Sequence, residues 1–306
     1  MALNVRKIAL FVLMTFALSW LLAETFFHLG GKLNSLLAMP VLVLYMFVPA
    51  TVTVIVQKVI CREGVVKPLQ VSFKPNGWFL VAWISPLFLA LGALGTALLL
   101  PGITFSPDMA GMFERYRGLV TPEQMKLMKQ QIASLPIHPF WLGALAGLVA
   151  GPTVNTIAGF GEELGWRGFL QKELGPLGFW KSSLLIGFIW GVWHAPVIVR
   201  GYNYPQHPVA GALMMTAFAM LLAPAFSYIR LRAKSVIAPS ILHGTLTATG
   251  GLAILVIKGG NDLTTGVTGL AGFVVLALVN LALVLYDQFL AAEPLMVQTK
   301  AERPAA

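Results

Sequence analysis

The sequence is poor in charged residues, which occupy only 11% of its 306 positions. A soluble domain carries about 25% charged residues, because its surface has to face water. Hydrophobic residues make up 57% of this chain, and its mean hydropathy is +0.79. So few charged residues are not enough to cover the surface of a water-soluble globular protein. We therefore predict an integral membrane protein whose first partner is the lipid bilayer.

The chain has one cysteine, Cys61, which excludes an intramolecular disulfide framework and a thiolate metal site. The net charge of +9 would suit nucleic acid, but no basic patch is interleaved with aromatic residues. The charges lie instead in the gaps between apolar runs, which is the pattern of positive-inside membrane topology. We expect no nucleic-acid partner.

Apolar runs recur along the whole chain, and a spanning helix needs about 20 apolar residues. The runs lie at about 8–29, 36–60, 77–100, 139–174, 179–199, 207–229, 236–257 and 267–290. Gly151-Pro152 breaks the fourth run, so we expect a fresh helix from about Thr153 to Leu174. The pattern predicts an all-α, polytopic transmembrane helix bundle of about eight spans, with residues 1–306 forming a single membrane domain.

Basic residues are distributed unevenly between these runs. When the N-terminus is placed in the cytoplasm, the inside segments hold about twice as many lysines and arginines as the outside segments. This bias predicts that both termini are cytoplasmic and that the hydrophilic insertion, residues 101–138, lies outside. Thr121 to Gln124 reads as a capping box with proline at the first helical position. We expect an amphipathic helix there and a disordered tail at 291–306.

Each ionisable side chain within an apolar run is a candidate functional group, because a charge inside a membrane is expensive. Residues 161–168 read Gly-Glu-Glu-Leu-Gly-Trp-Arg-Gly. On a helix Glu163 and Arg167 form an i, i+4 ion pair, whereas Glu162 points about 100° away and stays free for chemistry. A charged cluster at the inner membrane interface is the alternative.

Two histidines lie in later runs. The helical rise places Glu162 about 18 Å and His194 about 22 Å from the turn at 175–178, so the two can meet at a similar height. His243 lies in a later run, with Thr247 one turn further on the same face. Packing alone is a poor explanation for three polar centres that converge inside one bundle.

These residues resemble the three motifs of the CAAX-processing and bacteriocin-processing family, which comprises intramembrane glutamic endopeptidases. The motifs are Glu162-Glu163-x-x-x-Arg167, a span ending in His194, and His243 in a later span. The resemblance covers about residues 150–250, the expected catalytic core. It implies a peptide or membrane-protein substrate, and no cofactor or metal.

The resemblance also implies roles. Glu162 would activate a water with the help of His194, and Glu163 and Arg167 would support the first motif. His243 and the residue four positions later, Thr247, would stabilise the oxyanion.

The sequence departs from the family at two positions. Trp190 stands where the family often has Phe, which keeps an aromatic wall. Thr247 stands where it often has Asn, which replaces an amide donor with a shorter hydroxyl and puts the oxyanion contribution of this position in doubt.

Three other readings remain open. In a zinc-dependent intramembrane protease Glu162, His194 and His243 would be ligands, but the chain has no H-E-x-x-H helix. A non-catalytic immunity or scaffold protein would keep the motif for packing. A transporter would use glutamate and histidine as a proton relay, but the two halves show no matched broken helices. The compact form favours a bacterial plasma membrane.

Overall fold

The computed structural model describes residues 3–116 and 121–296. Of the predicted disordered tail, residues 297–306 lie outside this description. Residues 291–296 lie within it and turn back onto the last helix. There the backbone amides of Leu295 and Met296 donate hydrogen bonds to the Asp287 carboxylate, so this part of the tail is held against the bundle.

Helices form nearly all of the regular structure. In chain order the elements are α1 (Val5–His28), α2 (Ala38–Val54), η1 (Ile55–Ile60), α3 (Gly77–Ala97), β1 (Thr104–Phe105), α4 (Ala110–Tyr116), α5 (Pro122–Ala133), α6 (Pro139–Ala150), η2 (Gly151–Asn155), α7 (Thr156–Glu163), η3 (Leu164–Leu170), α8 (Gln171–Leu174), η4 (Gly175–Leu177), α9 (Phe179–Trp193), α10 (Ala195–Ile198), α11 (Pro208–Ala233), α12 (Ile237–Thr249), α13 (Leu252–Leu255), β2 (Ile257–Lys258) and α14 (Leu270–Phe289).

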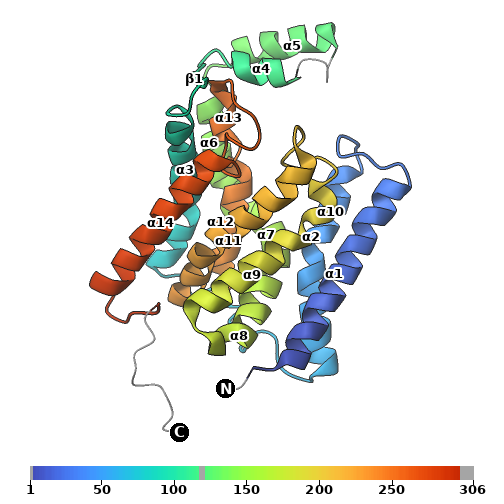
Figure 1. The fold of residues 1–306 in the computed structure, drawn as a ribbon, viewed down its shortest axis with the longest axis vertical. Coiled ribbons are helices and arrows are strands. Elements are labelled where there is room, and N and C mark those ends of the chain that lie inside the picture. Colours follow the sequence, from blue (N-terminus) through green and yellow to red (C-terminus); the bar gives the residue numbers. More distant parts are fainter. Residues whose placement is uncertain (1–2, 117–120, 297–306) are drawn as a thin grey trace.

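The predicted all-α, polytopic bundle is confirmed, and Figure 1 shows its long helices packed together with α4 and α5 at one end. Within the described ranges, six helical segments are long and apolar enough to cross a membrane: 5–28, 38–60, 77–97, 139–177, 208–233 and 270–289. The other two predicted spans are also helical. However, α9 has 15 residues and α12 has 13, so each rises only about 20 Å at 1.5 Å per residue.

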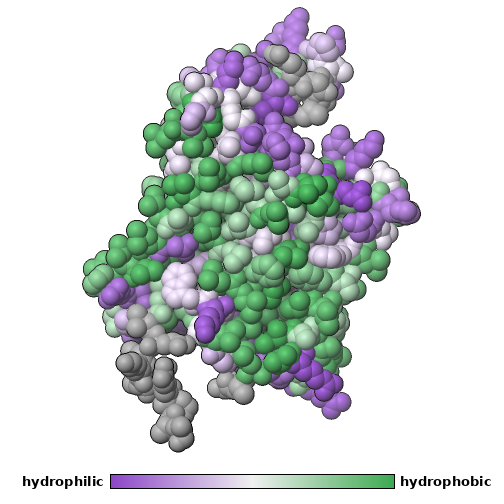
Figure 2. Space-filling model, in the orientation of Figure 1, coloured by the Kyte–Doolittle hydropathy of each residue, from purple (hydrophilic) through white to green (hydrophobic). Residues whose placement is uncertain are grey.

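The two ends of the bundle differ. One end, the insertion end, carries residues 101–116 and 121–138 together with the connections 29–37, 199–207 and 250–269. At the opposite, basal end α1 begins and α14 ends (Figure 1). Figure 2 shows a hydrophobic band across the middle of the molecule, with hydrophilic residues gathered toward its ends. This is the surface that a lipid bilayer covers.

The fourth span is not broken at Pro152, so the predicted fresh helix at Thr153 is wrong. The chain continues as one helix from 139 to 177, with wide π-helical turns at η2 and η3. Proline deprives the carbonyl four residues earlier of its helical donor. Here that carbonyl, on Leu148, accepts a hydrogen bond of 2.7 Å from the Trp83 indole of α3. The neighbouring helix therefore compensates for the lost bond.

The insertion contains the predicted helix with its capping box and, in addition, a short strand that the sequence did not predict. α5 begins with the expected capping box, in which the Thr121 hydroxyl accepts from Gln124 and the Gln124 side chain accepts from Thr121. The amphipathic helix carries no buried residue. The sequence did not predict the two-stranded pairing of β1 with β2, in register Thr104–Lys258 and Phe105–Ile257. This short ladder ties the insertion to the segment that precedes α14.

Candidate active site

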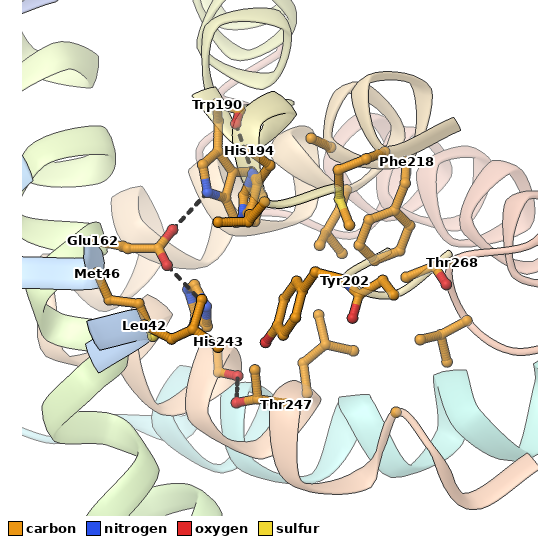
Figure 3. Close-up of a pocket in the computed structure, with 18 of the residues that line it drawn as sticks. Leu42, Met46, Glu162, Trp190, His194, Tyr202, Phe218, His243, Thr247 and Thr268 are labelled. Carbon is orange, nitrogen blue, oxygen red and sulfur yellow. Dashed lines mark hydrogen bonds and ion pairs between the residues drawn. The ribbon is translucent and has the colours of Figure 1, made fainter. Parts of the chain in front are cut away.

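A cavity of about 410 Å³ lies within the bundle and reaches the loops of its insertion end. Its walls come from helices α2, α7, α9, α11 and α12, together with loop residues near 202 and 250. Figure 3 shows Glu162, His194 and His243 around one side of this space. The three polar centres predicted from the sequence therefore share one cavity.

Glycines of the first motif set the position of Glu162. A Cβ atom at Gly161 would lie 2.8 Å from the Met46 carbonyl oxygen, and one at Gly165 would lie 2.6 Å from the Pro49 Cβ. Both distances are shorter than a packed side chain allows. These two glycines therefore allow α7 and η3 to pack directly against α2. This packing places Glu162, which lies between the two glycines in the sequence, at the cavity wall.

Glu162 is held by two indoles. Its Oε2 accepts a hydrogen bond of 2.7 Å from Trp190 Nε1 and a longer one of 3.4 Å from Trp166 Nε1. Its Oε1 lies 3.9 Å from His243 Nε2 (Figure 3). The residue is 2% exposed and lines the cavity. The sequence treated Trp190 only as an aromatic wall, but its N–H group orients the carboxylate, which phenylalanine at this position does not do.

Glu163 makes two contacts rather than one. The predicted ion pair is present, with Arg167 Nη1 3.1 Å from Glu163 Oε2. In addition, Glu163 Oε1 lies 2.8 Å from His243 Nδ1. Because a carboxylate only accepts, Nδ1 of His243 carries a proton, and its Nε2 is the nitrogen directed to Glu162 and the cavity. Glu163 therefore links Arg167 to His243 and fixes the orientation of the imidazole.

Arg167 is fully buried. Its guanidinium lies between two aromatic rings, 4.4 Å from the Trp190 centroid and 4.5 Å from the Phe226 centroid. Arg167 and Glu163 are each 0% exposed, so the motif is not a solvated cluster at a membrane interface. Cation–π contacts of this kind compensate part of the lost hydration of the cation.

His243 reaches this network because α12 crosses the π-helical turn η2 at close range. A Cβ atom at Gly244 would lie 2.4 Å from the Gly151 carbonyl oxygen, and one at Gly151 would lie 2.3 Å from Thr245 Oγ1. Only glycine at both positions allows this approach. The break that we expected at Gly151-Pro152 is thus a crossing point that places His243 beside Glu163.

His194 follows directly on α9 and lies on the cavity wall. Its Nδ1 is 2.8 Å from the Trp190 carbonyl oxygen. A carbonyl accepts and does not donate, so Nδ1 carries the proton and Nε2 keeps a free lone pair. No hydrogen bond joins His194 to Glu162 in the described part of the chain, although both residues line the same cavity. Both side chains instead bond to Trp190: Glu162 accepts from its indole N–H group, and His194 donates to its backbone carbonyl oxygen.

Thr247 lies on the same face of α12 as His243 and lines the cavity. Its hydroxyl donates back into its own helix, toward the carbonyl oxygens of His243 at 2.9 Å and Gly244 at 3.0 Å. The proton is therefore not directed at the cavity. This geometry agrees with the doubt that the threonine raised about oxyanion stabilisation at this position.

Tyr202 is a cavity residue that the sequence reasoning missed. It lies in the loop between α10 and α11, where nothing in the local pattern marks a site, and its ring enters the cavity (Figure 3). No three His, Cys, Asp or Glu side chains of the described residues converge closely enough to hold a metal ion.

Comparison with known families identifies this region. Residues 139–249 match the family model described as type II CAAX prenyl endopeptidase Rce1-like. These residues belong to the Rce1-like family. The matched segment runs from the start of α6 to the end of α12. No curated protein matches the chain.

The Rce1-like segment contains the six residues that the sequence singled out: Glu162, Glu163, Arg167, His194, Thr247 and His243. It also contains Trp190, Tyr202 and both ends of the crossing at Gly151 and Gly244. The matched family consists of membrane proteases. Within the matched segment of this chain, a carboxylate and two imidazoles meet at the cavity.

Proposed function

We propose that the protein is an intramembrane glutamic endopeptidase that hydrolyses a peptide bond of a membrane-associated protein or peptide, with residues 150–250 as its catalytic core. The observation that carries this proposal is the arrangement of the buried Glu162 and His243 and the half-buried His194 around one cavity inside an apolar bundle. Peptide hydrolysis needs a base for water and hydrogen-bond donors where negative charge develops. The cavity offers both kinds of group.

In the first step Glu162 accepts a proton from a water molecule in the cavity. The water oxygen bonds to the carbonyl carbon of the substrate, and the electron pair of the carbonyl double bond moves to its oxygen. Trp190 keeps Oε2 of Glu162 occupied, so Oε1 is the oxygen available to the water. The free lone pair of His194 Nε2 gives the water a second acceptor.

The charge balance of the cluster supports a donor role for His243. Glu162 and Glu163 carry two negative charges against the single positive charge of Arg167, and a buried charge is stable only when it is paired. A protonated His243 removes this imbalance. Its Nε2–H group then faces the cavity and donates to the oxyanion.

In the second step the tetrahedral intermediate collapses. The carbon–nitrogen bond breaks, and the leaving nitrogen receives the proton that Glu162 took from the water, directly or through His194. The carboxylate of Glu162 is thereby regenerated. Glu163 and Arg167 do not touch the substrate in this scheme but hold His243 in place.

The position of the cavity bears on where the substrate comes from. Its lining reaches Tyr202, Asn203 and Thr268, which belong to loops of the insertion end. We propose that both termini, and with them the basal end, are cytoplasmic and that the membrane is a bacterial plasma membrane. The substrate then reaches the site from the membrane or from its outer side.

Cysteine labelling tests this orientation. Lys126 lies in α5 and Lys67 in the loop before α3, and both are exposed. In a Cys61→Ser background, we expect Lys126→Cys to react with an impermeant maleimide in intact cells and Lys67→Cys to react only after lysis. The reverse labelling pattern would show that the cavity faces the cytoplasm.

The activity is tested by comparing new peptide termini in membranes that contain the wild-type chain or Glu162→Gln. We expect a set of membrane-protein cleavages that disappears in the variant and persists when the wild-type membranes are treated with EDTA and 1,10-phenanthroline. Loss of the cleavages on chelation, with one zinc per purified chain, would favour a metalloprotease. Identical termini in both membranes would favour a scaffold or immunity protein.

A further inference from the structure

Tyr202 combines a position in the cavity with an available proton. The hydrolysis proposed above creates an oxyanion, and such sites commonly direct more than one donor at it. His243 supplies one donor. Thr247 does not supply the second, because its hydroxyl is bonded to carbonyl oxygens of its own helix.

The loop of residues 199–207 holds Tyr202 firmly. The backbone amide of Tyr202 donates to the Val197 carbonyl oxygen at 3.1 Å, and the carbonyl oxygen of Tyr202 accepts from the Tyr204 amide at 2.8 Å. The Tyr204 hydroxyl in turn donates to the Thr268 carbonyl oxygen at 2.7 Å, which fastens the loop to the opposite segment. The ring of Tyr202 is therefore presented to the cavity from a fixed backbone.

The Tyr202 hydroxyl points into the cavity, toward the wall that carries His243 and Thr247 (Figure 3). Within residues 3–116 and 121–296 it forms no hydrogen bond. Tyr45, which lines the same cavity, is different, because its hydroxyl donates to the Trp193 carbonyl oxygen at 2.6 Å. The Tyr202 proton is thus available to a bound molecule.

The hydroxyl also remains protonated. Burial, together with the negative charge of Glu162, raises the pKa of the Tyr202 phenol above its ordinary value. A phenol is a donor only below its pKa, so raising that pKa extends the donor form further into the alkaline range.

We propose that Tyr202 is a catalytic residue that donates a hydrogen bond to the substrate oxyanion, in the role that the hydroxyl of Thr247 does not fill. This inference rests on the proposed endopeptidase function. The tyrosine forms no covalent bond and transfers no proton. It meets the carbonyl oxygen as the water adds to the carbonyl carbon, and together with His243 it stabilises the charge that develops there.

The test measures steady-state kinetics of the full-length chain in detergent. The probe is an internally quenched synthetic peptide that spans a Glu162-dependent cleavage site found in the membrane comparison above. Tyr202→Phe keeps the ring and removes the hydroxyl, so we expect kcat to fall by roughly 100-fold, as when one oxyanion donor is lost. KM and the melting temperature should stay unchanged. The matched control is Tyr286→Phe, which removes a hydroxyl of α14 that lies outside the cavity and should leave kcat unchanged.

The other outcomes are decisive. A wild-type kcat for Tyr202→Phe, or a raised KM with unchanged kcat, would overturn the donor role while the endopeptidase function stands. An equal loss of kcat in Tyr286→Phe would mean that the effect does not depend on a hydroxyl in the cavity, and would overturn the donor role as well. If no cleavage depends on Glu162, the endopeptidase function itself fails, and the role of Tyr202 fails with it.

Discussion

Glu162→Gln should lower the turnover of the protein by at least about 100-fold, the usual scale for the loss of a general base, while the fold survives. The amide has nearly the same shape as the carboxylate but does not accept a proton from water. Its carbonyl oxygen still accepts the hydrogen bond that Trp190 donates to Oε2. The substitution removes a buried charge rather than a packed apolar group, so the melting temperature should not fall. Peptide cleavage and thermal unfolding in detergent measure the two effects.

Glu173→Gln is the matched control. Glu173 belongs to the same helical segment and is paired with Lys7 at 2.8 Å, at the basal end and outside the cavity. This variant should cleave at the wild-type rate, even if it unfolds at a lower temperature. A Glu162→Gln protein that cleaves as fast as Glu173→Gln would remove Glu162 from the mechanism.

Glu163→Gln should damage both stability and activity. The amide leaves the buried Arg167 without its ionic partner, and an uncompensated buried charge costs about 3–5 kcal/mol. It also replaces the charged acceptor of His243 Nδ1, which lies 2.8 Å away, with the weaker neutral acceptor of an amide. The sequence alone assigned Glu163 a structural task only, whereas this contact makes it a positioning residue for the imidazole as well. Melting temperature and kcat should therefore both fall.

The double variant Glu163→Gln/Arg167→Gln separates the two effects. Removing the cation with its partner should recover part of the lost stability, because no unpaired charge remains. Turnover should stay low, since His243 still lacks its carboxylate. Full recovery of turnover in the double variant would mean that Glu163 acts only through Arg167.

Local spacing was sufficient to predict part of this site. The i, i+4 relation of Glu163 and Arg167 and the capping box at Thr121 depend only on the geometry of one helix, and both are present. The apolar runs likewise predicted the long helices, because about 20 apolar residues are required to span a bilayer.

Contacts between segments were harder to predict. The sequence placed Glu162 opposite His194 by counting rise along two helices, but rise gives height and not direction. The π-helical turns η2 and η3 flank α7, so the spacing of an ideal α-helix does not give the direction of Glu162 and Glu163, and His243 rather than His194 contacts the carboxylates. Tyr202 could not be found at all, because a loop tyrosine has no periodic signal before the loop closes over the cavity.

The buried ionic network also affects how the protein is assembled. Residues 139–177 carry Glu162, Glu163 and Arg167 in the interior of one long helical segment. A charged side chain at the centre of an isolated membrane helix costs roughly 2.5–3.5 kcal/mol on insertion scales. The Glu163–Arg167 pair and the long bond from Trp166 to Glu162 are internal to the segment, whereas Trp190 and His243 belong to later helices. We therefore expect the buried charges of this segment to be fully compensated only after α9 and α12 have packed against it, so that completion of the site also stabilises the segment within the membrane.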